Sequence, residues 1–309
     1  MKKILWFILT FAIVGFGQNL SVVGTEHISL GKNGDFSFPQ FSPDGSKILF
    51  TQSGLRGLWL YDLSDKSTIQ LNDYIGAGYE PKFTADGKQV IFRTDEYIQK
   101  RRYSSLAIQA IGDKKIQYLT EKMRHLSPAI LLSSDRLVYR VNEAVKSVSL
   151  NNNKSVQTNI ANETFGYIDN RKIIIQNNGV RKELVPIENR DYVWFSLSPN
   201  KSEFVFTVVG GSTFISDING NILTELGKAN APKWSPDGKW ILYMVDEDDG
   251  HVITSSDVWA YNLEKETRFQ LTKTNDIHEM YPAWSPKMDK VVCEVNSGNI
   301  VIIDIRIDG

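Results

Sequence analysis

Three histidines lie in polar stretches whose residue types could hold a metal ion. His125, His251 and His278 each fall where the sequence predicts a connection between strands, and acidic residues accompany two of them. The acidic neighbours are Asp246, Glu247, Asp248, Asp249 and Glu279. Two imidazoles and a carboxylate suit zinc or manganese, so His251 and His278 are the candidate metal ligands.

The acidic run has two other interpretations. Residues 246–249 could form the solvated tip of a hairpin, which we favour because connections between strands are usually polar. They could also bind calcium, although D-E-D-D-G lacks the alternation of an EF-hand loop. The chain has no ligand spacing of a known metal site. We therefore expect no cofactor, with a divalent metal as the alternative.

A cation pair beside an aromatic residue forms the second candidate site. Arg101, Arg102 and Tyr103 could bind the carboxylate of a sugar acid or of an acidic protein. The competing interpretation is a charged edge that prevents association between sheets. Both candidates lie in segments that we expect to be long loops, 94–105 and 245–257, and the 273–282 loop should reach the same end of the molecule. The candidate binding face comprises Arg101, Arg102, Tyr103, Asp248, Asp249, His251, His278 and Glu279.

The elements that must position these residues are repeats. FSPDGSKILF at 41–50 returns as FTADGKQVIF at 83–92 and as WSPDGKWILY at 234–243. Each copy is predicted to be a hairpin, because Asp bonds to the local backbone and Gly adopts a positive φ in such turns. The structural turn residues are Asp44, Gly45, Asp86, Gly87, Asp237 and Gly238. We expect the aromatic residue that opens each copy to pack against a neighbouring repeat.

Weaker copies extend the pattern along the chain. Aligned on the opening aromatic, the copies begin at Phe41, Phe83, Ile130, Tyr167, Leu197, Trp234 and Trp284. The spacing is close to the roughly 40–45 residues of a four-stranded propeller blade. We therefore predict an all-β propeller of four-stranded antiparallel blades, seven in number, with six as the alternative. Residues 24–31 resemble a fourth strand and should complete the last blade, so that the two chain ends close the ring.

Composition and the N-terminal residues indicate an exported protein. The segment 1–17 has the charged, apolar and small-residue order of a signal peptide, followed by a single domain over 18–309. The only cysteine, Cys293, lies in a predicted strand, so no lipoprotein cysteine is expected and Cys293 is interpreted as a core residue. The net charge of −1 favours neither nucleic acid nor an anionic membrane as partner. We expect a periplasmic or secreted monomer without a membrane span after signal cleavage, with an uncleaved N-terminal membrane anchor as the alternative.

The repeats resemble the TolB-like (WD40-like) propeller repeat family, whose mark is an aromatic-Ser-Pro-Asp-Gly turn with a Pro two residues before the aromatic. The matching stretches are PQFSPDG at 39–45, PKWSPDG at 232–238 and PAWSP at 282–286. The resemblance implies the fold, whereas members of the family do very different work. TolB carries a further N-terminal domain, for which we see no room before Phe41.

Two functions therefore compete. The first, which we favour, is a non-enzymatic propeller that binds or scaffolds an envelope or secreted protein, or a glycan. The second is a metal-dependent polysaccharide lyase or hydrolase of the oligogalacturonate-lyase type, using His251 and His278. The chain has no G-x-S-x-G motif, which argues against a serine peptidase.

Overall fold

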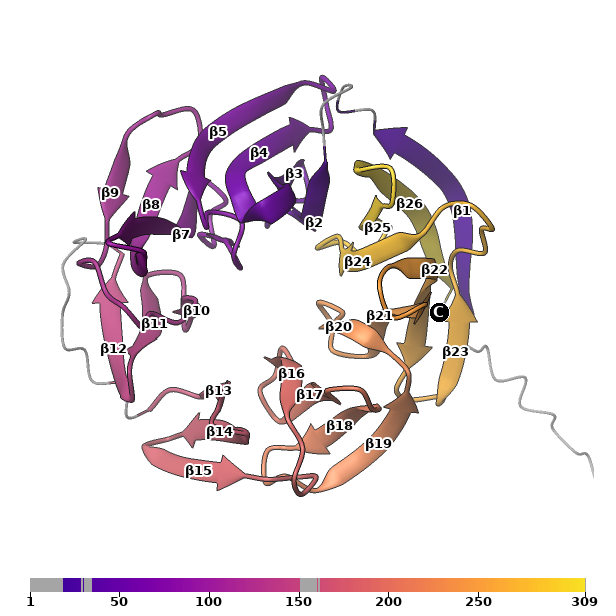
Figure 1. Cartoon of the computed structure of the whole chain (residues 1–309). Coiled ribbons are helices and arrows are strands. Elements are labelled where there is room, and N and C mark those ends of the chain that lie inside the picture. The colour runs from indigo at the N-terminus through magenta and orange to yellow at the C-terminus, as the bar shows by residue number, and fades with distance from the viewer. Residues whose placement is uncertain (1–18, 29, 31–34, 151–159, 161, 309) are drawn as a thin grey trace, which may run out of the picture.

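The chain forms a ring of seven antiparallel β-sheets, in agreement with the predicted seven-bladed propeller (Figure 1). The computed structural model describes residues 19–28, 30, 35–150, 160 and 162–308. The predicted signal peptide, residues 1–17, lies outside this range. Within the described residues, no helix has the length and apolar character needed to cross a membrane.

Five of the seven blades have four strands, as predicted. Blade 1 contains β2 (Phe36–Phe41), β3 (Lys47–Gln52), β4 (Arg56–Asp62) and β5 (Thr68–Ile75), with a short 3-10 helix η1 (Ser53–Leu55) between β3 and β4. Blade 2 contains β6 (Lys82–Phe83), β7 (Gln89–Ile98), β8 (Arg101–Ala110) and β9 (Ile116–Tyr118). Blade 5 contains β16 (Tyr192–Leu197), β17 (Glu203–Val208), β18 (Thr213–Asp217) and β19 (Ile222–Gly227). Blade 6 contains β20 (Asn230–Trp234), β21 (Trp240–Asp248), β22 (Ile253–Asn262) and β23 (Thr267–Gln270).

Blades 3 and 4 depart from the predicted pattern, since each has three strands within the described residues. Blade 3 contains β10 (Ile130–Leu131), β11 (Arg136–Val141) and β12 (Ala144–Ser149), and blade 4 contains β13 (Phe165–Asp169), β14 (Lys172–Asn177) and β15 (Val180–Leu184). The faint copies at Ile130 and Tyr167 therefore belong to two separate short blades. The turns between the first and second strands of blades 3 and 4, 132–135 and 170–171, are shorter than the five-residue turns of the clear copies in blades 1, 2 and 6. A shorter turn has no room for the full five-residue turn that begins with Ser-Pro-Asp-Gly, which explains why the motif is weak there.

The seventh blade joins the two ends of the described chain. It contains β24 (Glu279–Trp284), β25 (Lys290–Val295) and β26 (Asn299–Asp308), and β1 (Asn19–Ile28) pairs antiparallel with β26 as its outer strand. Pairing runs from Asn19 opposite Asp308 to Ile28 opposite Ile300. The closing strand thus begins five residues earlier than the predicted segment 24–31. The first half of β1 does not resemble the fourth strands of other blades in sequence, so the repeat pattern did not reveal it.

The repeated turns adopt the conformation that their sequence predicts. Gly45, Gly87 and Gly238 have φ angles of 74°, 68° and 74°. In the first copy Asp44 accepts hydrogen bonds from Ser42 Oγ (2.6 Å) and from the Ser46 backbone N–H (3.0 Å), and these bonds lower its pKa to about 2. The ionised carboxylate therefore holds the turn closed at neutral pH.

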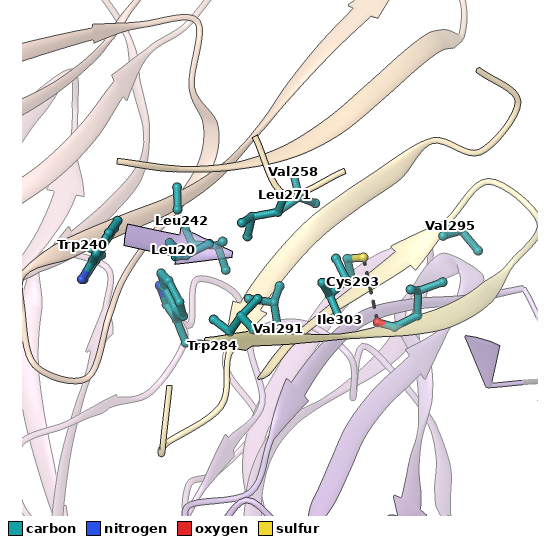
Figure 2. Packing of buried hydrophobic residues seen from close by; sticks show 13 residues of the cluster. Leu20, Trp240, Leu242, Val258, Leu271, Trp284, Val291, Cys293, Val295 and Ile303 are labelled. Carbon is teal, nitrogen blue, oxygen red and sulfur yellow. Dashed lines mark hydrogen bonds between the residues drawn. The ribbon is translucent and has the colours of Figure 1, made fainter. Parts of the chain in front are cut away.

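In blades 1, 2, 6 and 7 the opening aromatic, Phe41, Phe83, Trp234 or Trp284, packs on the preceding blade. Trp284 lies with Trp240 and Leu242 of blade 6 in one buried cluster, which also contains Leu20 of the closing strand (Figure 2). The indole Nε1 of Trp284 donates to the backbone oxygen of Lys233 at 3.3 Å. Cys293 belongs to the same cluster and is fully buried, and its thiol donates to the Val301 oxygen at 3.9 Å. The recurrence of the motif is thus a requirement of blade-to-blade packing.

A non-glycine residue with positive φ recurs at the same place in the inner strands of blades 1, 5, 6 and 7, and just before the inner strand β6 of blade 2. These residues stand three positions before the aligned aromatic or its substitute: Phe38 (55°), Glu80 (50°), Trp194 (52°), Ala231 (49°) and Tyr281 (49°). In four of these strands the register with the second strand shifts there, as expected of a β-bulge. A bulge re-aims side chains, and the inner strands surround the propeller axis (Figure 1).

Candidate binding face

One end of the ring collects the turns between second and third strands and the connections between successive blades. The backbone N–H of Gly78, between β5 and β6, donates to the Leu55 oxygen at 3.1 Å, which joins such a connection to the β3–β4 turn. On blade 7 the Asn296 side-chain amide donates to the Asp276 oxygen at 3.2 Å and makes the equivalent link. We call this end the hairpin face.

The prediction of long loops at 94–105 and 245–257 was wrong, because both segments continue the sheets as extended hairpins. Strands β7 and β8 pair without interruption up to Ile98 opposite Arg101, and the turn consists of Gln99 and Lys100. Strands β21 and β22 pair up to Asp248 opposite Ile253. The polar composition suggested loops, but a strand that projects beyond the core has no need of apolar residues.

The acidic hairpin of blade 6 uses its carboxylates to hold its own turn. Asp249 accepts the backbone N–H groups of Val252 and His251, both at 2.9 Å, and these bonds lower its pKa. Asp248 accepts the N–H of Gly250 at 2.9 Å. Asp248, Asp249 and His251 are exposed. This geometry agrees with a solvated hairpin tip at Asp248 and Asp249, whereas Asp246 is buried in β21 and accepts the Asn230 side-chain amide at 2.7 Å.

Glu279 is buried and belongs to the scaffold of the same face. Its carboxylate accepts the Thr274 hydroxyl at 2.9 Å, and its backbone oxygen accepts the Ser256 hydroxyl of β22 at 2.6 Å. Burial raises the pKa of Glu279. The neighbouring His278 is half-buried. These contacts fix the 273–282 connection against blade 6.

The described His, Cys, Asp and Glu side chains include no group of three that could hold a metal ion. His251 and His278 therefore have no common carboxylate ligand in the part of the chain that the structure describes. The two-histidine and carboxylate set considered as the alternative is not assembled among these residues.

Arg102 instead joins a cationic cavity between blades 2 and 3. This cavity of about 270 Å³ is lined by Arg102, Arg124, His125, Leu126, Ser127, Arg140 and Asn142, and we call it the arginine pocket. Arg102 comes from β8, Arg124 and His125 from the β9–β10 connection, and Arg140 from β11. No carboxylate lines it.

The connection that carries Arg124 and His125 is pinned on both sides. Met123 forms a two-way backbone bridge with Ser104 of β8, with N···O distances of 2.8 and 2.9 Å. On the other side the Asn142 N–H donates to the His125 oxygen at 3.2 Å, and the Arg140 N–H donates to Ser127 Oγ at 2.8 Å. The side chains of Arg124 and His125 therefore stand on a backbone segment that is bonded to both neighbouring blades.

The three arginines differ in their charge balance. Arg140 pairs with Asp169 at 2.6 Å, and its guanidinium lies 4.4 Å from the centre of the Tyr167 ring. Arg124 lies 5.8 Å from the centre of the Tyr103 ring. Neither Arg102 nor Arg124 has an ion pair among the described residues, and both are exposed. Within the described part of the chain, the arginine pocket thus presents two unpaired guanidinium groups to solvent.

A second cavity of about 210 Å³ adjoins this region on blade 2. It is lined by Tyr74, Thr94, Asp95, Glu96, Tyr103, Ser105, Tyr118 and Lys122. Glu96 and Lys122 form an ion pair across it. Tyr103 is shared, because its ring lines this cavity and also faces Arg124. Of the predicted face, the structure therefore brings Arg102 and Tyr103 together with residues that the sequence analysis did not group with them.

Arg124 and Arg140 were missed, and His125 was noticed only as a loop histidine. Arg124 and His125 are adjacent polar residues within an inter-blade connection, which is a usable signal in the sequence. Arg140 lies inside the strand pattern of a degenerate repeat, where it looked like part of the scaffold. Its place beside Arg124 depends on how the 124–128 segment docks on β11.

The fold and this site define a seven-bladed β-propeller with a cationic pocket on its hairpin face. No protein-family model matches the chain, and no curated protein sequence matches it. Similar solved structures include an oligogalacturonate lyase from Vibrio parahaemolyticus, with a TM-score of 0.63 and 12% identity, over 93% of this chain and 98% of that one. TolB from Acinetobacter baumannii matches with a TM-score of 0.53 and 16% identity, over 83% of this chain and 58% of that one. At these identities the likeness establishes the fold alone.

Proposed function

We propose that this chain is an exported, non-enzymatic propeller of the TolB-like repeat type that captures an acidic protein partner on its hairpin face. The observation that carries the proposal is the arginine pocket, where Arg102 and Arg124 face solvent without a carboxylate partner among the described residues. Guanidinium groups bind carboxylates through paired, charge-assisted hydrogen bonds.

The surroundings of the pocket favour a protein over a glycan as the partner. Tyr97 and Ile98 at the tip of the β7–β8 hairpin are 61% and 43% exposed, and they pair with Arg102 and Arg101 in the sheet. Exposed aromatic and aliphatic side chains beside arginines are typical of protein interfaces. The cavity has room for an acidic side chain, and the hairpin tip offers apolar contact beside it.

The lining of the pocket also supports a binding function over catalysis. Proton transfer in enzymes usually uses an acid and a base within reach of the same substrate. The lining of the arginine pocket contains no carboxylate that could act with the His125 imidazole as such a pair. The Ser127 hydroxyl is occupied, because it donates to the Pro128 oxygen at 2.9 Å and accepts the Arg140 N–H.

The alternative function is metal-dependent cleavage of an acidic polysaccharide. Its support is the fold likeness to an oligogalacturonate lyase and the presence of His251 and His278 on the hairpin face. Release of unsaturated sugars from polygalacturonate in the presence of manganese, lost in His251→Ala or His278→Ala, would favour this alternative.

Charge reversal tests the proposed capture. Arg102→Glu with Arg124→Glu should weaken binding of a labelled polyglutamate peptide at least roughly 10-fold, since a hydrogen bond to a charged group contributes about 1.5–3 kcal/mol. The matched control is Lys88→Glu with Lys287→Glu, which makes the same charge change at exposed turn positions on the opposite end. Binding is measured by fluorescence anisotropy at two salt concentrations. Equal loss in both variants would mean that net charge, and not the pocket, attracts the peptide.

The same two variants should then be compared as baits in an envelope extract. The proposal expects one acidic protein to be retained by the unmodified chain and by the control variant, and to be lost with the arginine variant. Export is tested separately by fractionation and by N-terminal sequencing of the mature chain.

A further inference from the structure

The cavity of about 210 Å³ on blade 2 is lined by three tyrosines, Tyr74, Tyr103 and Tyr118, which come from three different strands. We call it the tyrosine pocket. Tyr103 and Tyr118 belong to β8 and β9 of blade 2, whereas Tyr74 belongs to β5, the outer strand of blade 1. The tyrosine pocket therefore lies where blade 1 meets blade 2, whereas the arginine pocket lies between blades 2 and 3.

The strand register of blade 2 directs one row of side chains toward this pocket. In the β7–β8 ladder Thr94 lies opposite Ser105, and Glu96 lies opposite Tyr103. Tyr118 of β9 continues the row on the third strand of the sheet. Alternate residues of a strand share one face of a sheet, so these lining residues project from the same face.

Tyr74 closes the pocket from the side of blade 1. Its ring stacks on Phe92 of β7, with ring centroids 6.1 Å apart and an angle of 29° between the planes. Phe92 is buried in the cluster that joins blades 1 and 2, so this wall of the pocket rests on the core. Tyr118 is 52% exposed, and much of its ring is therefore free for contact with a ligand.

Two buried hydroxyl groups of the lining lack a protein partner. Thr94 is 9% exposed and Ser105 is 2% exposed, and both line the pocket. Neither side chain forms a hydrogen bond with another residue that the structure describes. Nearly all buried polar groups in proteins are hydrogen-bonded, because an unsatisfied group has lost its hydration without compensation. A ligand with donors and acceptors of its own would satisfy these two hydroxyls.

The charged side chains around the pocket are balanced. Glu96 and Lys122 form an ion pair, and each side chain is 52% exposed, which places the pair at the rim. The carboxylate of Asp95 accepts hydrogen bonds from the guanidinium of Arg93 at 3.0 Å and from Ser104 Oγ at 2.6 Å. The lining therefore offers no unpaired charge to an ionic ligand, and it favours a neutral, polar one.

We propose that the tyrosine pocket binds one residue of a neutral glycan. The faces of a sugar ring carry C–H bonds, which pack on aromatic rings such as those of Tyr74 and Tyr118. The edge of the ring carries hydroxyl groups, which can bond to Thr94, Ser105 and the ion pair at the rim. The volume is below the roughly 300 Å³ at which pockets begin to enclose drug-sized ligands, so it suits a single sugar unit.

Two other ligands fit these observations less well. A proline-rich peptide also packs on tyrosine rings, but proline side chains offer nothing to two free hydroxyl groups. A uronic acid has the hydroxyl groups but brings a carboxylate for which the lining has no unpaired cation. The sugar site goes beyond the proposed capture of an acidic protein, and its lining shares no residue with that of the arginine pocket.

Titration with methyl glycosides of glucose, galactose and mannose tests the proposal. Binding to the full chain is followed by saturation-transfer NMR, in which the signals of a weakly bound sugar report its contact with the protein. We expect at least one of the three glycosides to bind saturably, with an affinity that does not change with salt because the ligand is neutral. The uronate counterpart of that sugar should bind no more tightly.

Two substitutions in the lining assign the binding to the pocket. Tyr118→Ala should weaken binding of the sugar at least roughly fivefold, since it removes an accessible aromatic face. Thr94→Val keeps the shape of the side chain and removes one hydroxyl. It should weaken binding roughly threefold or more while the Tm stays equal or rises, because no hydrogen bond within the protein is lost. The two opposite effects distinguish a ligand contact from a general loss of folding.

Tyr97→Ala is the matched control, because it removes a tyrosine that is 61% exposed at the hairpin tip and does not line the pocket. Its affinity for the sugar should equal that of the unmodified chain. The variant with Arg102→Glu and Arg124→Glu should also bind the sugar normally although it captures the acidic peptide poorly. A failure of the sugar site can therefore be told apart from a failure of the proposed function.

Four outcomes would overturn the proposal. The first is the absence of saturable binding for all three neutral glycosides, and the second is equal affinity in Tyr118→Ala and the unmodified chain. The third is tighter binding of the uronate counterpart, which would make the ligand acidic. The fourth is saturable binding of a polyproline peptide that the glycosides do not displace, which would assign the pocket to a peptide.

Discussion

The backbone N–H of Phe38 donates a hydrogen bond to Oε2 of Glu294 at 2.7 Å, across the junction where blade 1 meets blade 7. Phe38 is a bulge residue, so its N–H has left the ladder of its own sheet. At the preceding junction the bulge residue Tyr281 donates its N–H to Met244 Sδ at 3.4 Å. Glu294 and Met244 occupy equivalent positions in their second strands. Second-strand side chains thus satisfy the donors that the bulges release.

Glu294 should make the stability of the ring depend on pH. Burial raises its pKa from an ordinary value of 4.5 to about 7, so the folded protein binds this proton more tightly than the unfolded chain does. The stability linked to the proton is fully present below about pH 4.5 and is lost as the pH rises through about 7, by up to roughly 3 kcal/mol. Acids whose pKa is lowered, such as Asp44, act in the opposite direction at lower pH.

The variant Glu294→Gln isolates this contribution, since the amide oxygen can still accept the Phe38 N–H. We expect it to be roughly 1–3 kcal/mol more stable than the unmodified protein at pH 8 and nearly equal to it at pH 5. Urea denaturation at the two pH values measures the difference. A gap of the same size at both would show that ionisation of Glu294 is not the cause.

The closing strand β1 should contribute strongly to stability although only Leu20 and Ile28 of its residues are buried. Ile28→Ala should cost about 2–4 kcal/mol, because it opens space in the cluster shared by blades 7 and 1. Val23→Ala on the same strand is the control, since Val23 is 58% exposed. Deletion of 19–28 should lower the Tm further by exposing the edge of β26. An unchanged Tm after the deletion would contradict the role given to β1.

The turn glycine Gly238 should tolerate no β-branched side chain. Its φ is 74°, and a Cβ there would meet Pro199 Cδ of blade 5 at 3.5 Å. Gly238→Val should therefore destabilise the fold by roughly 1–3 kcal/mol. Gly112→Val is the comparison. Gly112 has a φ of 89°, and a Cβ added there would meet no atom within 4 Å, so this variant reports backbone strain alone. Thermal denaturation of the two variants should show the larger loss for Gly238.

Substitutions in the two extended hairpins should affect stability and partner capture differently. Arg101→Glu should leave the Tm nearly unchanged, since exposed charges contribute less than about 1 kcal/mol, and should slow capture with a changed salt dependence. Asp249→Ala should lower the Tm, because the turn loses the acceptor of two backbone hydrogen bonds. If Asp249→Ala also weakens capture as much as Arg101→Glu, the acidic hairpin belongs to the binding surface as well.

Repetition made the propeller predictable from the sequence. A blade cannot bury its apolar faces alone, so the aromatic that covers the neighbouring blade recurs in blades 1, 2, 6 and 7, and the Asp-Gly turn that places it recurs in blades 1, 2 and 6. Phe41 and Trp284 show this rule, since each packs on the blade before it. The positive φ of Gly45, Gly87 and Gly238 follows from local chemistry and needed no knowledge of the ring.

Only the tertiary structure decided which charged residues meet. Arg102, Arg124 and Arg140 lie on segments of different blades, so no local pattern in the sequence joins them. His251 and His278 looked like partners because both follow acidic or polar stretches, yet the blade 6 hairpin uses its carboxylates for its own turn. Local turns and packing motifs depend on neighbours in the chain, whereas a binding site depends on distances across the ring, which the closing strand and the docking of each connection determine.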